Sequence, residues 1–219
     1  MKKPPAVSSA REPRPTNDAS RFPAVWNLAN GITLGRLVLS LVFFVVLYKG
    51  TRARTHVVAL ALFAAASLTD FLDGWVARRR NEVTPFGRVA DPLVDKILIC
   101  GAMILLCFIP EAERLGLTAG VATTVMVREF LVTWLRGWVE GKGIPFGASW
   151  LGKFKFVLQT AVVLVIQAHL AGVIPPVPAE GPLYWGVRSL VWLMMGVTVL
   201  SGVGYLVRGW QYFRGEFRA

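Results

Sequence analysis

Residues 70–96 read DFLDGWVARRRNEVTPFGRVADPLVDK, and they place four aspartates inside an otherwise apolar chain. The 219 residues are 54% hydrophobic and 17% charged, whereas about a quarter of the residues in a soluble domain are charged. Around this stretch, six apolar runs are long enough to cross a membrane. We therefore expect one all-α integral membrane domain with six transmembrane helices. The runs lie near residues 31–49, 56–79, 92–110, 117–139, 152–174 and 185–207.

The two ends of the chain differ in composition from these runs. Residues 1–21 are rich in Pro, Ser and Arg and lack an apolar stretch, so we expect a disordered tail and no cleaved secretory signal. Residues 22–30, FPAVWNLAN, mix aromatic and amide side chains, which favours a short interfacial helix. The membrane domain should then cover residues 22–208, followed by a cytoplasmic tail at 209–219.

The net charge of +11 comes from basic residues that mostly flank the apolar runs. No motif that reads DNA or RNA accompanies them, so we interpret them as topology signals and contacts with anionic lipid. Most lie in the N-terminal tail, after the second and fourth runs, and in the C-terminal tail. Both termini and the aspartate stretch should therefore lie on the cytoplasmic side of a cell membrane. The opposite side holds Lys49, Arg52, Arg54 and Arg114.

On an α-helix, the first half of the quoted stretch forms one polar face. Asp70, Asp73, Gly74, Ala77 and Arg78 fall within an arc of about 140°. The face thus combines two carboxylates, two very small residues and a cation.

A second face follows in the next run. Gly87, Asp91 and Asp95 recur every four residues, so they share one side of a helix. We expect a turn at residues 85–87, which would let the two helices pack antiparallel with their acids opposed.

Four carboxylates in apolar helices need counter-charge. One Asp at a helix centre costs about 3 kcal/mol, and four would cost on the order of 10 kcal/mol. Clustered oxygen ligands without His or Cys suit Mg²⁺ or Mn²⁺, and two such ions could clamp a diphosphate. The alternative is that the acids only cap helices and pair with nearby arginines. Capping fits Asp91, which precedes Pro92, but it does not explain why acids and small residues share a face on both helices.

The stretch resembles the signature of the CDP-alcohol phosphatidyltransferase family, D-x2-D-G-x2-A-R-x8-G-x3-D-x3-D, at every defined position. The resemblance implies a diphosphate-activated substrate held on two metal ions, with release of CMP. It further implies that Asp95 is the general base and also a metal ligand. The remaining implied ligands are Asp70, Asp73 and Asp91 for the metals, and Gly74, Ala77, Arg78 and Gly87 for the CDP group.

Basic residues in the fourth and fifth runs indicate the acceptor. Cations facing a membrane pocket suit an anionic acceptor, in particular a phosphate. The segments REFLVTWLRGW and SWLGKFKF resemble the phosphatidylglycerophosphate synthase branch of the family. This resemblance implies that Arg128, Arg136 and Lys153 bind the phosphate of sn-glycerol 3-phosphate. For Lys155, snorkelling toward the interface is an equal alternative.

Two further features bear on the same site. Phe156 departs from the branch, which often has Thr at this position. NGITLGR resembles the first span of the branch, and it implies that Thr33 and Arg36 border the active site.

The predicted function is transfer of the phosphatidyl group of CDP-diacylglycerol to sn-glycerol 3-phosphate. Alternatives within the family are inositol phosphate, phosphatidylglycerol or serine as acceptor. An intramembrane prenyltransferase would need a second Asp-rich motif, and an ion transporter commonly has paired repeats; neither is evident. The family often forms homodimers, so a homodimer is implied by resemblance.

His56 and His169 have no second ligand at metal spacing, and we interpret them as structural. Cys100 and Cys107 lie on one helix as buried thiols without a disulfide.

Overall fold

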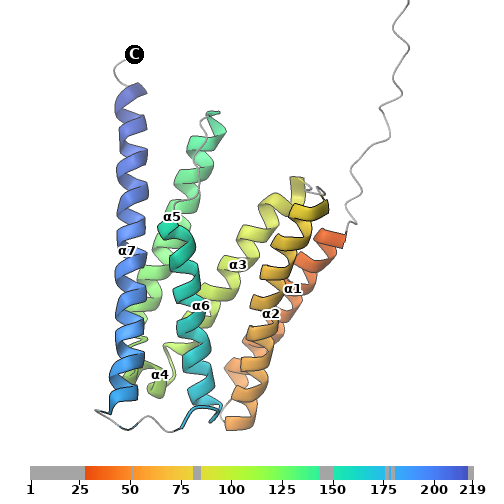
Figure 1. Ribbon diagram of the computed structural model, residues 1–219, viewed down its shortest axis with the longest axis vertical. Coiled ribbons are helices and arrows are strands. Elements are labelled where there is room, and N and C mark those ends of the chain that lie inside the picture. The colour runs from red at the N-terminus through yellow and green to blue at the C-terminus, as the bar shows by residue number, and fades with distance from the viewer. Residues whose placement is uncertain are drawn as a thin grey trace, which may run out of the picture.

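The computed structural model describes residues 28–50, 52–80, 85–143, 150–175, 178 and 181–216. Within this part the regular structure is helical and contains no strand, which confirms the all-α prediction (Figure 1). The helices are α1 (Leu28–Lys49), α2 (Ala53–Arg80), α3 (Pro85–Leu106), α4 (Pro110–Arg114), α5 (Ala119–Gly141), α6 (Trp150–Leu170) and α7 (Pro182–Glu216).

The long helices lie side by side in two groups that α3 and α6 connect. α1 packs against both α2 and α3, while α7 packs against both α5 and α6. Between the groups, α2 contacts α6, and α3 contacts α5 and α6. In Figure 1, α3 crosses the bundle obliquely, and the short α4 lies at the end away from the C-terminus. Residues of α3, α5 and α6 therefore meet near the middle of the molecule.

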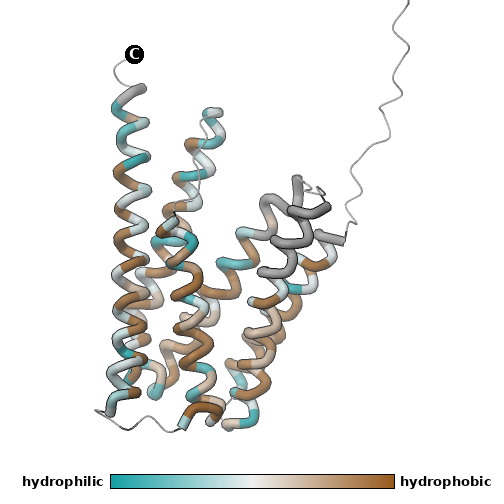
Figure 2. Tube along the Cα trace, in the orientation of Figure 1, coloured by the Kyte–Doolittle hydropathy of each residue, from teal (hydrophilic) through white to brown (hydrophobic). Residues whose placement is uncertain are grey.

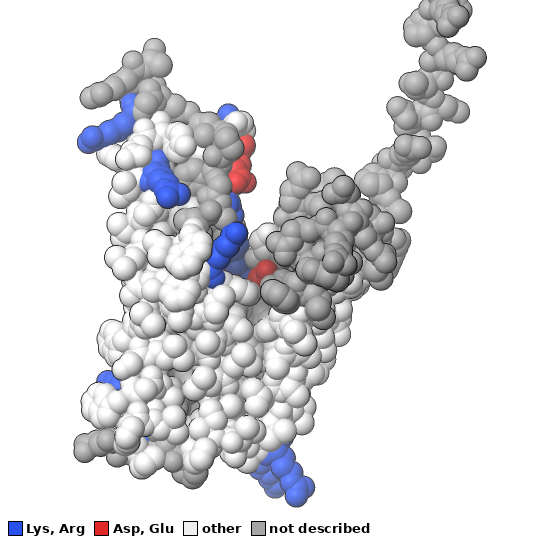
Figure 3. Space-filling model, in the orientation of Figure 1, with Lys and Arg blue, Asp and Glu red and all other residues white. Residues whose placement is uncertain are grey.

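Apolar side chains fill the core and also cover much of the outside. Phe43, Phe63 and Met103 are fully buried, and the rings of Phe43 and Phe63 are 5.5 Å apart. Leu34, Val45 and many other large apolar side chains are exposed. Figure 2 shows apolar residues along most of the helices, and most charged side chains on the face in Figure 3 lie in its upper half. An extended exposed apolar surface marks contact with a membrane or with another protein.

Three described helices are long and apolar enough to cross a membrane, which supports a membrane protein. They comprise Gly31–Lys49, Trp150–Leu170 and Pro182–Arg214, while the apolar part of α2, Ala53–Thr69, is shorter. α3 and α5 are also 22 and 23 residues long but contain several charged residues. The same charges that form the candidate site lower the hydropathy of these helices.

The predicted turn at residues 85–87 is wrong, because α3 begins at Pro85. Proline is favoured at a first helical position, where its missing N–H is not needed. Pro92 lies inside α3, so Asp91 is not at a helix start, and this counts against the capping interpretation.

Other boundaries also differ from the prediction. The short α4 was not expected, and α7 continues past the predicted end at 207 as far as Glu216. The tail at 1–21 and most of the interfacial segment lie outside the described residues, and residues 28–30 form the start of α1.

Gly101 marks a close approach of α3 to α1. A Cβ atom added there would lie 2.7 Å from Cε1 of Phe44 and closer still to its Cζ. We expect Gly101→Ala to destabilise the protein by about 1–3 kcal/mol, because the ring must shift out of a packed position. The measurement is thermal unfolding of the detergent-solubilised protein.

The matched control is Gly196→Ala on α7, where a new Cβ meets nothing within 4 Å. Alanine favours a helix interior, so this variant should be unchanged or more stable. Equal melting temperatures for the two variants would contradict the packing of α1 on α3.

Candidate active site

The four aspartates lie on two consecutive helices, close to the segment that connects them. Asp70 and Asp73 are in the C-terminal half of α2, and Asp91 and Asp95 are one helical turn apart in α3. The helical state on which the predicted faces depend is thus confirmed. Of these four side chains, the structure describes only that of Asp95. The predicted grouping of the acids with Gly74, Ala77, Arg78 and Gly87 falls on side chains outside the described part and remains a prediction.

Asp95 is held by an arginine from another helix. Nη1 of Arg36, on α1, donates a hydrogen bond to Oδ1 of Asp95. The Arg36 side chain is 1% exposed, whereas that of Asp95 is 26% exposed. A buried guanidinium in an apolar bundle needs a carboxylate partner. Arg36 therefore lies beside the aspartate motif, as the resemblance implied, and Thr33 is buried one turn before it.

A cavity of about 160 Å³ opens next to Asp95, between α3, α5 and α6. Figure 3 shows a hollow between the two helix groups, with basic and acidic side chains on its walls. Phe156 is one of the lining residues, so the position that departs from the branch pattern faces the cavity. The lining consists of Pro92, Asp95, Lys96, Ile99, Glu129, Gly152, Lys155, Phe156 and Gln159.

Glu129, on α5, is the centre of a buried polar network at this cavity. Its Oε1 accepts hydrogen bonds from Nζ of Lys155, from Nη1 of Arg128 at 3.1 Å and from Nε2 of Gln159 at 3.4 Å. Nη2 of Arg128 also donates to Oγ of Ser201 on α7, at 2.8 Å. Lys155 is buried and paired, so its snorkelling interpretation is wrong.

The predicted acceptor residues lie at different depths. Arg128 is buried and reaches the cavity wall only through Glu129. Arg136 is partly exposed, with Nε 3.2 Å from Oε1 of Glu140, and Lys153 is exposed on α6. The structure thus brings Asp95 and the Arg128 network together at one cavity but leaves Arg136 and Lys153 nearer the surface.

Sequence reasoning missed Glu129 and Gln159. Glu129 could have been identified from the sequence, because an acidic residue inside an apolar run is energetically costly and often functional. Gln159 could not, because one amide in a span is compatible with many packing roles.

The described side chains at the cavity carry an excess of positive charge. Two carboxylates and two lysines line the cavity, and two arginines lie directly behind the wall, each paired with one of the carboxylates. With ordinary ionisation these six described groups sum to +2, and the cations among them can bind an anionic ligand. The cations are Arg36, Lys96, Arg128 and Lys155, and the carboxylates are Asp95 and Glu129.

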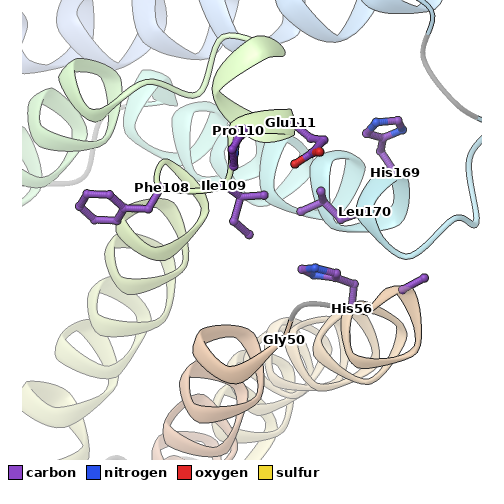
Figure 4. A pocket seen from close by; sticks show the side chains of 9 residues that line it. Gly50, His56, Phe108, Ile109, Pro110, Glu111, His169 and Leu170 are labelled. Atoms are coloured by element: carbon purple, nitrogen blue, oxygen red, sulfur yellow. The ribbon is translucent and has the colours of Figure 1, made fainter.

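A larger cavity of about 450 Å³ lies at the opposite end of the bundle (Figure 4). His56, Glu111 and His169 contribute polar groups to its wall, next to Phe108 and Leu170. It includes no Lys or Arg among its lining residues. Within the described part of the chain, no three His, Cys, Asp or Glu side chains are placed to hold a metal ion. The lining of the larger cavity therefore does not match a site that binds phosphate, despite the size of the cavity.

Comparison with known proteins agrees with the aspartate motif. Residues 26–203 match the CDP-alcohol phosphatidyltransferase family. The chain belongs to this family.

Relatives within the family cover nearly the whole chain. The CDP-diacylglycerol–glycerol-3-phosphate 3-phosphatidyltransferase of Bacillus subtilis is 32% identical over 198 residues, which are 85% of this chain and 97% of that protein. A probable phosphatidylglycerophosphate synthase of Mycobacterium tuberculosis is 35% identical over 206 residues, or 93% of this chain and 90% of the relative. The Pseudomonas fluorescens protein with the same name as that of B. subtilis is 30% identical, over 88% of this chain and 94% of its own length.

Arg36→Met should destabilise the protein by about 3–5 kcal/mol, because it leaves the Asp95 carboxylate without its buried partner. Thermal unfolding in detergent measures the loss. Adding Asp95→Asn to this variant should restore part of it, since both charges are then removed.

Arg188→Met serves as the control. Nη1 of Arg188 donates to the hydroxyl of Tyr184 at 2.9 Å near the other end of the bundle, and its loss should cost about 0.5–1.5 kcal/mol. If both arginine variants melted alike, or Asp95→Asn worsened Arg36→Met, the pairing of Arg36 with Asp95 would be contradicted.

Proposed function

We propose that this protein transfers the phosphatidyl group of CDP-diacylglycerol to sn-glycerol 3-phosphate, giving phosphatidylglycerophosphate and CMP. The observation that carries the proposal is the placement of Asp95. The last aspartate of a complete family motif borders a small cavity whose wall also holds Lys96 and Lys155. The names of the bacterial relatives support the same reaction.

The reaction is an in-line displacement at phosphorus. A hydroxyl oxygen of the acceptor forms a bond to the phosphatidyl phosphorus, and the bond from that phosphorus to the CMP oxygen breaks. Asp95 takes the proton of the attacking hydroxyl as general base. Arg36 fixes the orientation of the Asp95 carboxylate, since it binds one of the two oxygens.

The aspartates suit divalent metal ions. Their donor set is carboxylate oxygen alone, which hard ions such as Mg²⁺ or Mn²⁺ prefer. Asp70, Asp73, Asp91 and Asp95 would hold two ions, which when bound neutralise the diphosphate charge. Gly74, Ala77, Arg78 and Gly87 would form the adjoining CDP site.

The acceptor is small and anionic. A cavity of about 160 Å³ is well below the roughly 300–1,000 Å³ of sites for drug-sized ligands. That size suits a small acceptor, and the cations of the cavity wall favour a phosphorylated acceptor over serine. We propose that Lys155 at the cavity wall contacts the acceptor phosphate together with Arg136 and Lys153, while Arg128 adds positive charge from behind Glu129.

We propose a membrane topology of six spans. α2, α3 and α5 are 28, 22 and 23 residues long, and a span needs about 20, so helix length supports adding them to α1, α6 and α7. Six spans would put both termini on one side, and the basic flanks favour the cytoplasm for that side and for the aspartates.

An acceptor panel tests the proposed function. Purified protein with Mg²⁺ and CDP-diacylglycerol is assayed for CMP release with sn-glycerol 3-phosphate, inositol phosphate, phosphatidylglycerol or serine. We expect sn-glycerol 3-phosphate to give the highest rate. A higher rate with another acceptor, or no CMP release with any of them, would overturn the proposal.

Asp70→Asn and Asp91→Asn should each abolish turnover while the protein stays folded, because each removes charge where the diphosphate must be neutralised. The measurement is CMP release together with the melting temperature. Glu113→Gln on α4 is a matched charge-removing control and should keep its activity. Retention of more than about a tenth of wild-type turnover by either aspartate variant would contradict the metal site, since losing such stabilisation costs at least about a hundredfold.

Arg136→Ala and Lys153→Ala should each raise the KM for sn-glycerol 3-phosphate about ten- to hundred-fold, the effect of losing one charge-assisted hydrogen bond. The KM for CDP-diacylglycerol should change little. Plain glycerol provides the control, because it has no phosphate and its residual rate should be insensitive to both changes. Equal losses with the two acceptors would remove these residues from the phosphate site.

A further inference from the structure

We propose that Glu129 is a positioning residue for the acceptor: its carboxylate holds the Lys155 ammonium at the cavity wall and the Arg128 guanidinium behind it. The inference rests on the proposed function and concerns the same site. Neither the aspartate motif nor the predicted acceptor residues include Glu129. Its role follows from the contacts that meet at one of its oxygen atoms.

Three donors converge on Oε1 of Glu129. Lys155 and Gln159 approach from α6, where they are one helical turn apart, and Arg128 approaches from the neighbouring position on α5. The side chains of Glu129 and Lys155 are only 9% and 6% exposed. Ser201 of α7 binds the other end of the Arg128 guanidinium. The carboxylate therefore joins α5 to α6 and fixes two buried cations, and Arg128 extends the network to α7.

Lys155 needs such a partner to stay where it is. Its four-carbon side chain is flexible and ends in a strongly hydrated point charge. A buried ammonium without a carboxylate is costly, and the side chain would otherwise turn toward water. Glu129 thus sets both the location of Lys155 and its charge at the cavity.

The position of the pair distinguishes it from a purely structural ion pair. Glu129 and Lys155 both line the cavity that also contains Asp95 and Lys96. If the acceptor hydroxyl lies near Asp95, as proposed above, Lys155 on the same cavity wall is placed to bind its phosphate. A carboxylate beside a phosphate is repulsive in itself, so its placement there is explained by the cations that it fixes.

The test compares Glu129→Gln, Lys155→Met and the double variant. Glu129→Gln should raise the KM for sn-glycerol 3-phosphate at least about tenfold, through loss of a charge-assisted contact. The KM for CDP-diacylglycerol should stay within about twofold of wild type. Because Glu129 acts mainly through Lys155, the loss in the double variant should fall well short of the sum of the two single losses, a clear failure of additivity.

Folding is followed by the melting temperature in detergent, since an unpaired cation can destabilise the protein. If Glu129→Gln does not fold, Glu129→Asp provides the test. This variant keeps the negative charge on a shorter side chain. It should raise the KM for sn-glycerol 3-phosphate less than Lys155→Met does. Glu113→Gln is the matched control and should leave every constant unchanged.

Three results would overturn the inference while the wild-type enzyme remains active with sn-glycerol 3-phosphate. The first is an unchanged KM for this acceptor in the folded Glu129 variant. The second is additive losses in the double variant, and the third is an equal rise of the donor and acceptor KM. Inactivity of the wild-type protein with sn-glycerol 3-phosphate would instead refute the proposed function, and this inference with it.

Discussion

A charged side chain inside an apolar helix bundle must find a partner, and this constraint organises the protein. Arg36 is almost fully buried and meets Asp95 across α1 and α3. Glu129 neutralises part of the charge of Arg128 and Lys155 across α5 and α6. Breaking either pair would leave a charge in a poorly solvated place, which costs several kcal/mol. The same ion pairs that the bundle requires thus place five ionised groups at or directly behind the wall of a single cavity.

The all-helical class, and the placement of the four aspartates on two consecutive helices, could be predicted from the sequence because both depend on local pattern. Apolar runs and the spacing of residues 70–95 are readable along the chain. The partners of the buried cations could not be predicted from local pattern, because Arg36 and Asp95 are 59 positions apart and Arg128 and Ser201 are 73 positions apart. Only the packing of the helices decides such pairs. At Pro85 the local pattern led to a wrong prediction. Proline often ends a helix, so we expected a turn, but here it begins α3 at the first helical position, which tolerates it.

The size of a cavity and the chemistry of its lining favour different cavities as the active site. The larger cavity, at His56 and His169, has no Lys or Arg among its lining residues. The smaller one combines a motif aspartate with buried lysine and glutamate. Transfer of a phosphatidyl group between anionic substrates needs positive charge and a base in one place. Of these two cavities, the smaller one therefore fits the proposed reaction better.

The most direct measurement is a cryo-electron microscopy structure of the protein in lipid nanodiscs with sn-glycerol 3-phosphate bound. We expect the acceptor to occupy the cavity between α3, α5 and α6, with its phosphate within hydrogen-bonding distance of Nζ of Lys155 and a hydroxyl directed toward Asp95. Acceptor density in the cavity at His56 and His169, or a phosphate remote from Lys155, would contradict this placement.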